Sequence, residues 1–433
     1  MTLELAFPEE FVFGTATAAT QIEGGCTTSD WYAFSHRPGR TRNGDTTDVA
    51  CDSWNRWPED IAIQRGLGLG GYRMSIEWAR VEPRPDEIST AALERYRNIL
   101  GALREAAIEP MVTLHHFSLP GWLAERGGVL SDQFADRFGR FAGRAAAFLG
   151  DVCRHWVTIN EPNVLATQAY LLGAWPPASR QPLAAIRALY RLLEGHVAAY
   201  RTVKDALGES ALVGVAHHLR ATEPLRPASW SDRAAARLLD RLFNDGLALA
   251  LCEGRMFGAA DSLLSGGRAS IVKEARGTHD FFGVNYYTRD VVRFSSARAS
   301  ELFLARTTPP QAEVSDLGWE IYPQGLGRLV REWAARSRLP VYVTENGIAD
   351  AADTRRGPFL TRHLAELARA IRDGIDVRGY FHWSLLDNFE WAEGYEPRFG
   401  LVEVDYKTQA RRIRASGYLY AKIARERRVP SGS

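Results

Sequence analysis

Two glutamates in short polar motifs are the residues of this chain best suited to chemistry. Glu161 lies in Thr-Ile-Asn-Glu-Pro at residues 158–162, and Glu345 lies in Thr-Glu-Asn-Gly at residues 344–347. Each motif follows an apolar stretch typical of a buried strand, where packing favours apolar side chains, so function explains these carboxyls better than packing does. Two carboxyl groups that face one sugar can hydrolyse a glycosidic bond with retention, one as acid and the other as nucleophile.

A run near the C-terminus has the composition of a sugar-binding segment. Residues 382–391 read His-Trp-Ser-Leu-Leu-Asp-Asn-Phe-Glu-Trp, so Trp383 and Trp391 bracket Glu390. Indole rings stack on the C–H faces of a pyranose, and carboxylate and amide oxygens accept hydrogen bonds from its hydroxyls. The run by itself also suits core packing, and the two glutamate motifs are what favour sugar binding.

Arg73 is the candidate cation beside one of the two glutamates. It lies in Arg-Met-Ser-Ile-Glu-Trp at residues 73–78, in an expected strand. We expect a negative neighbour to raise the pKa of the acid and a cation to lower the pKa of the nucleophile. A structural ion pair is the alternative role for Arg73.

Composition excludes several classes of protein. The 433 residues are 45% hydrophobic and 24% charged, and 53 basic residues nearly balance 52 acidic ones, which disfavours nucleic acid or an anionic membrane as partner. The four cysteines show no metal-binding or disulfide spacing. The first residues lack a signal peptide, and no stretch reaches the roughly 20 apolar residues of a membrane span. We expect a cytoplasmic protein without a metal.

Short apolar runs alternate with helical patterns along the whole chain. The eight expected strands are residues 11–14, 71–76, 110–115, 155–159, 211–216, 281–286, 341–344 and 379–384. Clear helical periodicity occupies residues 90–107, 132–148, 182–207 and 359–373. This alternation predicts one (β/α)8 TIM barrel domain over residues 1–433, with long βα loops, and the polar residues that end the strands are where such barrels keep their active sites.

With these motifs in this order, the chain resembles a glycoside hydrolase family 1 β-glycosidase over nearly its full length. The resemblance implies a retaining, exo-acting enzyme that needs no cofactor and acts on small β-glycosides or short oligosaccharides. It implies that Glu161 is the acid/base and Glu345 the nucleophile, and that Asn285 and Tyr287 lie around them. It also implies a glycone pocket made of Gln21, His116, Asn160, Trp383, Glu390, Trp391 and Phe399.

Three residues depart from the usual family pattern. Thr20 stands where an aromatic residue commonly precedes the glutamine, and Phe117 and Ser118 follow His116 where Trp-Asp is frequent. Phe117 has no indole N–H, so a hydrogen bond to the glycone is missing and the ranking of gluco, galacto and fuco sugars stays open. The oligomeric state and the natural aglycone also stay open.

Several alternatives compete with the β-glycosidase interpretation. A 6-phospho-β-glycosidase is disfavoured because the carboxylates of Glu390 and Glu393 would repel a phosphate. A non-catalytic sugar-binding barrel is expected to lose one of the two glutamates, and a thioglucosidase can dispense with the acid. The adjacent pairs at residues 115–116 and 217–218 are histidines, but neighbours on a strand point to opposite faces and cannot chelate one ion together. We expect one of the first pair to line the pocket and the second pair to be structural or at the rim.

Overall fold

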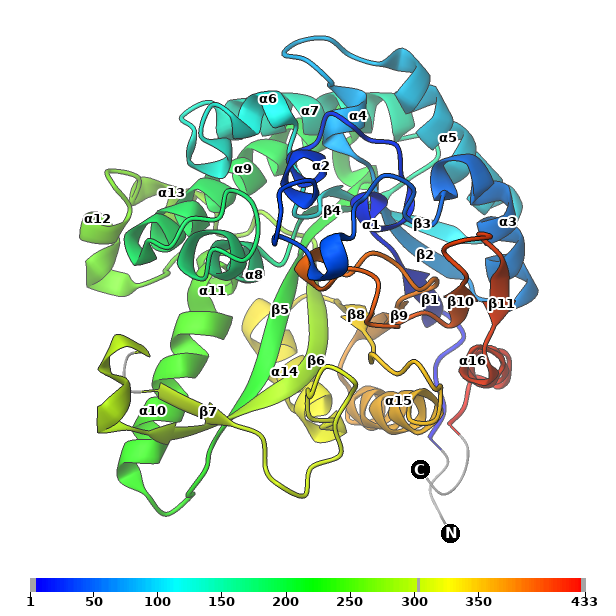
Figure 1. Ribbon diagram of the computed structural model, residues 1–433. Helices are drawn as coiled ribbons and strands as arrows, with labels where there is room; N and C mark the ends of the chain where they lie inside the picture. The colour runs from blue at the N-terminus through cyan, green and yellow to red at the C-terminus, as the bar shows by residue number, and fades with distance from the viewer. Residues whose placement is uncertain (1–4, 302–303, 430–433) are drawn as a thin grey trace.

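The computed structural model describes residues 5–301 and 304–429, and these form a closed barrel of parallel strands surrounded by helices (Figure 1). Around the barrel the strands follow the order β1, β2, β3, β4, β5, β6, β8 and β9, and closure comes from the β9–β1 and β5–β6 pairings. Their bounds are β1 Val12–Ala16, β2 Gly71–Ser75, β3 Glu109–His115, β4 His155–Asn160, β5 Leu212–Pro224, β6 Phe281–Phe294, β8 Val341–Asn346 and β9 Val377–Trp383.

Helices cover the outside of the barrel and cross from each strand to the next (Figure 1). The α-helices are α1 Ala19–Ile22, α2 Asp30–Ser35, α3 Ser53–Gly66, α4 Trp78–Val81, α5 Thr90–Glu105, α6 Gly121–Ala124, α7 Phe134–Leu149, α8 Pro162–Leu165, α9 Pro182–Leu207, α10 Trp230–Asp240, α11 Gly246–Glu253, α12 Asp261–Leu264, α13 Ser270–Glu274, α14 Pro323–Ser337, α15 Arg356–Arg372 and α16 Ala415–Glu426. The short 3-10 or π segments are η1 Arg42–Gly44, η2 Gly128–Leu130, η3 Ala166–Leu171, η4 Gly208–Ser210, η5 Arg241–Asp245, η6 Gly258–Ala260, η7 Ser296–Glu301 and η8 Trp391–Glu393.

All eight expected strands are present, and the (β/α)8 barrel prediction is confirmed. The bounds of β5 and β6 differ most, because both strands run well beyond the residues at which the apolar pattern ends. Beyond the barrel they continue as a paired ribbon from the pair Ala221 and Arg289 onward, and β7 Leu304–Thr307 adds to β6 antiparallel. Figure 1 shows this ribbon reaching α10. Ladder hydrogen bonds hold these residues in strands although their side chains are mixed in polarity.

The apolar side chains form two kinds of core. Large clusters lie between the strands and the outer helices, and they include the fully buried Trp78, Trp156 and Trp333. A smaller cluster joins inward-facing residues of several barrel strands, including Met111 and Phe381. The tight interior requires small residues: a Cβ at Gly14 of β1 would lie 2.6 Å from a backbone oxygen of β2.

A C-terminal hairpin and helix complete the fold. Strands β10 Val402–Val404 and β11 Arg411–Ile413 pair antiparallel, and α16 follows them. The described part of the chain contains no helix that is long and apolar enough to cross a membrane.

Candidate active site

A cavity of about 460 Å³ opens where the barrel strands end at their carboxyl sides. Most of the residues expected to form the site lie here, although they are scattered through the sequence. Eight of them line the cavity: His116, Glu161, Tyr287, Glu345, Trp383, Glu390, Trp391 and Phe399. Four more lie against these and are almost completely buried: Gln21, Arg73, Asn160 and Asn285.

Glu345 is held by one cation and one phenol. Arg73 Nη1 donates to Glu345 Oε1 at 2.5 Å, and the Tyr287 hydroxyl donates to Oε2 at 2.6 Å. The expected pairing of Arg73 with a site glutamate is therefore present. The motif's glycine has a steric reason, since a Cβ at Gly347 would lie 1.7 Å from the backbone oxygen of Trp383.

Asn160 connects Arg73, which contacts Glu345, to Asn285 and His116. Its Oδ1 accepts from Arg73 Nη2 at 2.7 Å and from Asn285 Nδ2 at 3.0 Å, so its Nδ2 is the atom that donates to His116 Nε2 at 3.1 Å. His116 therefore carries its proton on Nδ1, which has no partner among the described residues and is available to a bound molecule. Burial lowers the pKa of His116 well below its usual value, so this ring is neutral.

Glu161 sits at a sharp turn between β4 and α8. Its φ of 44° places it in the left-handed region, and Pro162 at the first position of α8 starts the helix directly after it. The Oε1 atom accepts from Asn285 Nδ2 and from His218 Nδ1, both at 2.9 Å. Asn285 is fixed in this orientation because its own Oδ1 accepts from the Thr344 hydroxyl at 2.6 Å.

The contact with His218 corrects an expectation from the sequence. We expected this second histidine pair to be structural or at the rim, and only His217 behaves so, since its ring stacks on Phe282 at 4.5 Å. The two rings do point to different sides of the strand, and His218 lines the cavity. The signal that selected the other site residues, a polar side chain just after a buried strand, applied to this pair as well. No group of three or more His, Cys, Asp or Glu side chains in the described ranges is placed to hold a metal ion.

The pKa shifts of Glu161 and Glu345 also differ in direction from the expected ones. Burial raises the pKa of Glu345 to about 7, and the negative charge of Glu161 adds to this rise while Arg73 and Tyr287 oppose it. Burial also raises the pKa of Glu161, but His218, Asn285 and Arg73 outweigh it and lower that pKa below its ordinary value. In the free site the two pKa shifts thus have directions opposite to the expected ones, and the donor His218, which was not foreseen, contributes to the lowered pKa of Glu161. Two buried carboxyls this strongly coupled share one proton near neutral pH.

The far end of the cavity is built by the loop after β9. Gln21 Nε2 donates to Asn388 Oδ1 at 2.8 Å, to the Phe389 carbonyl at 2.7 Å and to Glu390 Oε2 at 3.3 Å. Gln21 Oε1 has no partner within the described residues. Burial and the charges of Glu345 and Glu161 raise the pKa of Glu390 to about 8. Gln21 and Glu390 therefore present donors and acceptors to the same end of the pocket.

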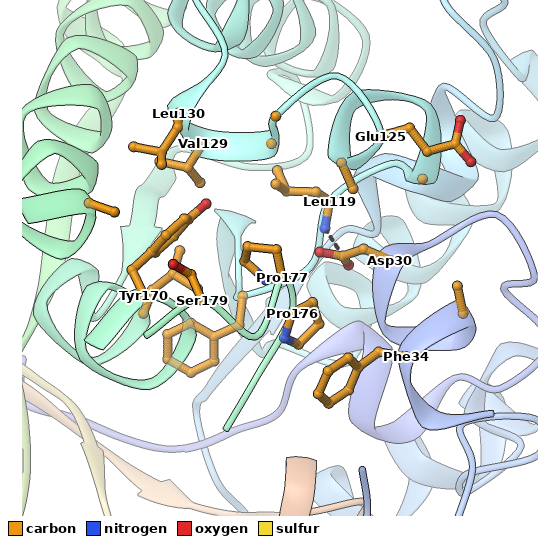
Figure 2. Close-up of a pocket in the computed structure, with 18 of the residues that line it drawn as sticks. Asp30, Phe34, Leu119, Glu125, Val129, Leu130, Tyr170, Pro176, Pro177 and Ser179 are labelled. Carbon is orange, nitrogen blue, oxygen red and sulfur yellow. Dashed lines mark hydrogen bonds between the residues drawn. The ribbon is translucent and has the colours of Figure 1, made fainter. Parts of the chain in front are cut away.

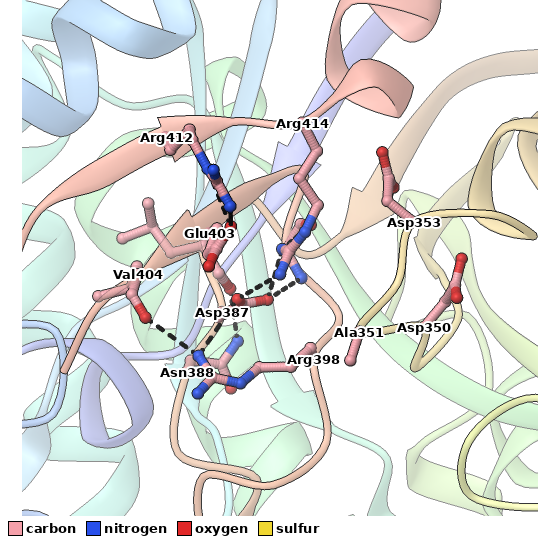
Figure 3. A network of polar contacts seen from close by, with 12 residues as sticks. Asp350, Ala351, Asp353, Asp387, Asn388, Arg398, Glu403, Val404, Arg412 and Arg414 are labelled. Atoms are coloured by element: carbon pink, nitrogen blue, oxygen red, sulfur yellow. Dashed lines mark hydrogen bonds and ion pairs between the residues drawn. The ribbon is translucent and has the colours of Figure 1, made fainter.

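An ion-pair network anchors that loop from behind (Figure 3). The buried carboxylate of Asp387 accepts from Arg414 Nη1 at 2.9 Å and Nη2 at 2.8 Å, and from the backbone N–H of Gly400 at 2.9 Å. Arg398 Nη1 lies 3.4 Å from the same carboxylate and donates to the Val404 carbonyl at 3.0 Å. The bidentate pair fixes the geometry of the loop between β9 and β10 that presents Glu390.

Two of the three residues that depart from the family pattern, Thr20 and Ser118, contact the buried carboxyl of Glu77. The Thr20 hydroxyl donates to Glu77 Oε2 at 2.6 Å, and the Ser118 hydroxyl donates to Glu77 Oε1 at 3.0 Å. The carboxylate that the family usually places after His116 is thus absent at that position, and two hydroxyls converge on a neighbouring buried carboxyl instead. Phe117 packs between Trp175 and Trp391, at 4.8 and 5.2 Å between ring centroids.

Phe117 also lines a second cavity of about 390 Å³. Figure 2 shows this cavity between α2, the segment around Leu119 and the loop with Pro176 and Pro177. Burial raises the pKa of Asp30 in its wall to about 7, although the carboxylate accepts from the Leu119 N–H at 2.9 Å. None of the predicted site glutamates lines this space.

The outer part of the first cavity is a mixture of apolar, aromatic, uncharged polar and basic side chains. It is lined by Val164, Thr167, Gln168, Leu172, Trp175, Arg220, Phe243, Arg306, Leu317 and Trp319. Sequence reasoning did not identify these residues as a group, because they come from α8, η3, β5, η5, β7 and the loops between elements.

Comparisons with known proteins agree with this geometry. The model of glycosyl hydrolase family 1 matches residues 3–429. The chain is 36% identical to beta-glucosidase A of Thermotoga maritima, over 97% of this chain and 98% of that protein, and 34% identical to a beta-glucosidase of Agrobacterium sp., over 98% and 96%. A structure of the Thermotoga maritima family 1 enzyme superposes with a TM-score of 0.94 at 33% identity, covering 99% of this chain and 100% of that chain.

Full-length agreement in sequence and structure, together with two buried glutamates facing one cavity, shows that this chain belongs to glycosyl hydrolase family 1 and is a glycosidase that hydrolyses O-glycosidic bonds.

Proposed function

We propose that the protein is a retaining, exo-acting β-glucosidase in which Glu345 is the nucleophile and Glu161 is the acid/base. The observation that carries this proposal is the division of partners between the two carboxyls. Arg73 and Tyr287 contact both oxygens of Glu345, while Asn285 and His218 contact a single oxygen of Glu161. Both oxygens of Glu345 are thus fixed by donors, which orients this carboxyl for attack, whereas Glu161 keeps one oxygen for proton transfer.

In the first step an oxygen of Glu345 attacks the anomeric carbon, the bond to the leaving oxygen breaks, and Glu161 gives that oxygen its proton. Positive charge that develops on the sugar ring beside Glu345 favours the ionised form of this carboxyl. The shared proton is thereby moved to Glu161, which reverses the order found in the free site.

In the second step water attacks the anomeric carbon of the glycosyl-enzyme and gives a proton to Glu161. The ester of Glu345 carries no charge, so the pKa of Glu161 is lower in the glycosyl-enzyme and rises again when the carboxylate of Glu345 is released. Glu161 therefore acts as a base while the ester exists and recovers its proton when the ester breaks.

Glucose as the glycone is supported by the relatives and by the far end of the pocket. One relative is beta-glucosidase A of Thermotoga maritima, and structures of the beta-glucosidase of that organism are known in complex with glucoimidazole and with deoxynojirimycin. In this chain the buried Gln21 and His116 and the partly buried Glu390 offer polar atoms there. Trp383 lines the same cavity as a stacking surface for the ring. β-Fucosides and β-galactosides are the next sugars in the proposed range, since Phe117 adds no hydrogen bond.

Phosphorylated sugars remain disfavoured. Arg42 lines the cavity, but it is paired with Glu393 at 2.6 Å and with Glu396 at 2.8 Å. The carboxylates of Glu390 and Glu393 would repel a 6-phosphate, and Arg42 is already paired with Glu393 and Glu396.

The test combines substrate range with stereochemistry. Initial rates of aryl release are measured for matched β-D-glucoside, β-D-galactoside, β-D-fucoside and 6-phospho-β-D-glucoside, and proton NMR records which anomer of glucose forms first. We expect fast cleavage of the glucoside and first release of the β anomer. First release of the α anomer would exclude retention, and cleavage of the phosphorylated sugar alone would exclude the β-glucosidase.

The nucleophile is tested separately with Glu345→Gln. This variant is expected to lose turnover and to keep glucose binding by calorimetry, because the amide has nearly the same shape but cannot form the ester. Unchanged turnover would contradict the assignment of Glu345.

A further inference from the structure

His218 is the one histidine of the second pair that reaches the acid/base proposed above, and three neighbours fix its ring. Its Nδ1 lies 2.9 Å from Glu161 Oε1, and the side chain is buried. The ring stacks on Tyr287 at 5.7 Å between centroids and meets Phe243 edge-on at 5.6 Å. The backbone register places His218 opposite Asn285 on the neighbouring strand, so both residues approach Glu161 from one side.

The hydrogen-bond chain behind His218 determines its tautomer. Arg220 Nε donates to His218 Nε2 at 3.3 Å, and Arg220 Nη1 is 3.3 Å from Asp290 Oδ1. A guanidinium can only donate, so Nε2 is an acceptor and the ring proton is on Nδ1. His218 therefore donates to Glu161, with Arg220 and Asp290 holding the donor in place.

The two oxygens of the Glu161 carboxyl have different surroundings. Both hydrogen bonds that it accepts from described side chains end on Oε1, one from His218 and one from Asn285. An oxygen that already accepts two donors is a poor place for a proton, so the transferable proton is carried on Oε2.

We propose that His218, oriented by Arg220, is a positioning residue for the acid/base, which occupies Oε1 of Glu161 and directs the transferable proton to Oε2. This inference rests on the proposed function, because it assumes that Glu161 is the acid. It concerns a residue that touches the acid and not the reacting bond, and it predicts effects confined to the steps in which Glu161 moves a proton.

The charged and titratable groups around Glu161 define the expected effect of pH. Two of them, His218 and Tyr287, are titratable groups that act here as neutral donors, and the others are Arg73, Glu345 and Glu390; they come from β2, β5, β6, β8 and the loop after β9. His218 is the neighbour whose removal takes away a donor to Glu161 and leaves both site glutamates and Arg73 in place. A lost donor disfavours the carboxylate, so Glu161 keeps its proton to higher pH and the alkaline limb of kcat/KM moves up, by about one pH unit.

The leaving group separates a positioning role from a structural one. Cleavage of a 2,4-dinitrophenyl glucoside needs no protonation of the leaving oxygen, whereas cleavage of a β-linked glucose disaccharide does. In His218→Phe the ring stacking is retained and the donor is lost. We expect kcat/KM to fall about tenfold or more with the disaccharide and less than about threefold with the dinitrophenyl glucoside.

Three further variants serve as controls. His218→Asn puts an amide nitrogen at the position of Nδ1, so it is expected to restore the disaccharide rate and the pH profile. His217→Phe, on the same strand but stacked on Phe282, is expected to match the parent protein in both. Glu161→Gln reports on the proposed function itself, and it is expected to lose far more activity on the disaccharide than on the dinitrophenyl glucoside.

Each result leads to a distinct conclusion. A selective loss in His218→Phe with rescue by His218→Asn supports the positioning role. Equal losses on both substrates, or an unmoved alkaline limb, would overturn it while Glu161→Gln still shows its selective loss. If Glu161→Gln loses activity equally on both substrates, the proposed acid/base is wrong and the proposed function fails first.

Discussion

Glu390→Gln is expected to stabilise the protein at alkaline pH while it weakens glycone binding. The pKa of this carboxyl is 4.5 in the ordinary state and about 8 in the folded protein, raised by burial first and then by Glu345 and Glu161. Below the ordinary value both the folded and the unfolded chain keep the proton, so the carboxyl costs nothing. As the pH rises, the unfolded chain ionises first, and the stability that the protonated carboxyl contributes is lost until the folded pKa is reached.

The magnitude follows from the size of that difference. At about 1.4 kcal/mol for each pH unit, the full linkage between about pH 5 and about pH 8 is about 4 kcal/mol. Glu390 lines the cavity and is only partly buried, so we take half of this value. Glu390→Gln should therefore be nearly neutral at about pH 5 and more stable than the parent by about 2 kcal/mol at about pH 8, which is about 2 °C in Tm for a chain of this length.

The assay is thermal unfolding of both proteins at the two pH values at one scan rate. Glu393→Gln is the matched control, because its side chain is half-exposed at the rim and pairs with Arg42. We expect that control to change stability by less than about 0.5 kcal/mol at either pH. A gain in Glu390→Gln that is equal at both pH values, or present only at the lower one, would refute the reasoning.

Three other predictions follow from single contacts. Tyr287→Phe removes the 2.6 Å hydrogen bond to Glu345, so kcat/KM should fall about 10- to 100-fold. The acid limb of its pH profile should also move to higher pH, because the ionised nucleophile is less stabilised, and an unchanged limb would contradict the role of the phenol. Gly347→Ala forces a Cβ to 1.7 Å from a backbone oxygen and should lower the free energy of unfolding by at least about 3 kcal/mol. The control Gly101→Ala, in the open interior of α5, should raise the free energy of unfolding by about 0.5 to 1 kcal/mol. Similar melting temperatures for the two variants would disprove the steric argument. Phe117→Trp should lower KM for aryl glucosides about threefold by adding an indole donor, and a KM that does not fall would show that this wall makes no contact with the glycone.

Local sequence patterns were sufficient for the barrel and for most of the site. Alternation of short apolar runs with helical periodicity predicts parallel strands with crossovers, and eight such units close into a barrel. The strand-end position then places Glu161 and Glu345 at one face, since parallel strands end on the same side. The family resemblance identified the more distant Gln21 and Phe399, which no local pattern would join to Glu345.

Contacts between distant segments decided the features that the sequence left open or assigned wrongly. The polar ends of β5 and β6 do not show strand periodicity, and their extension depends on the ribbon and on β7 pairing alongside. The roles of His217 and His218 differ because adjacent strand residues face opposite sides, and only the register with Asn285 shows which one reaches Glu161.

The amino-acid sequence by itself determined the order of elements, the chemical groups available and the family, because these depend on local periodicity and on short motifs. The tertiary structure decided which donor meets which carboxyl oxygen. That choice sets the proton affinities of Glu161, Glu345 and Glu390, since burial and charges a few ångströms away act across segments that lie far apart in the chain.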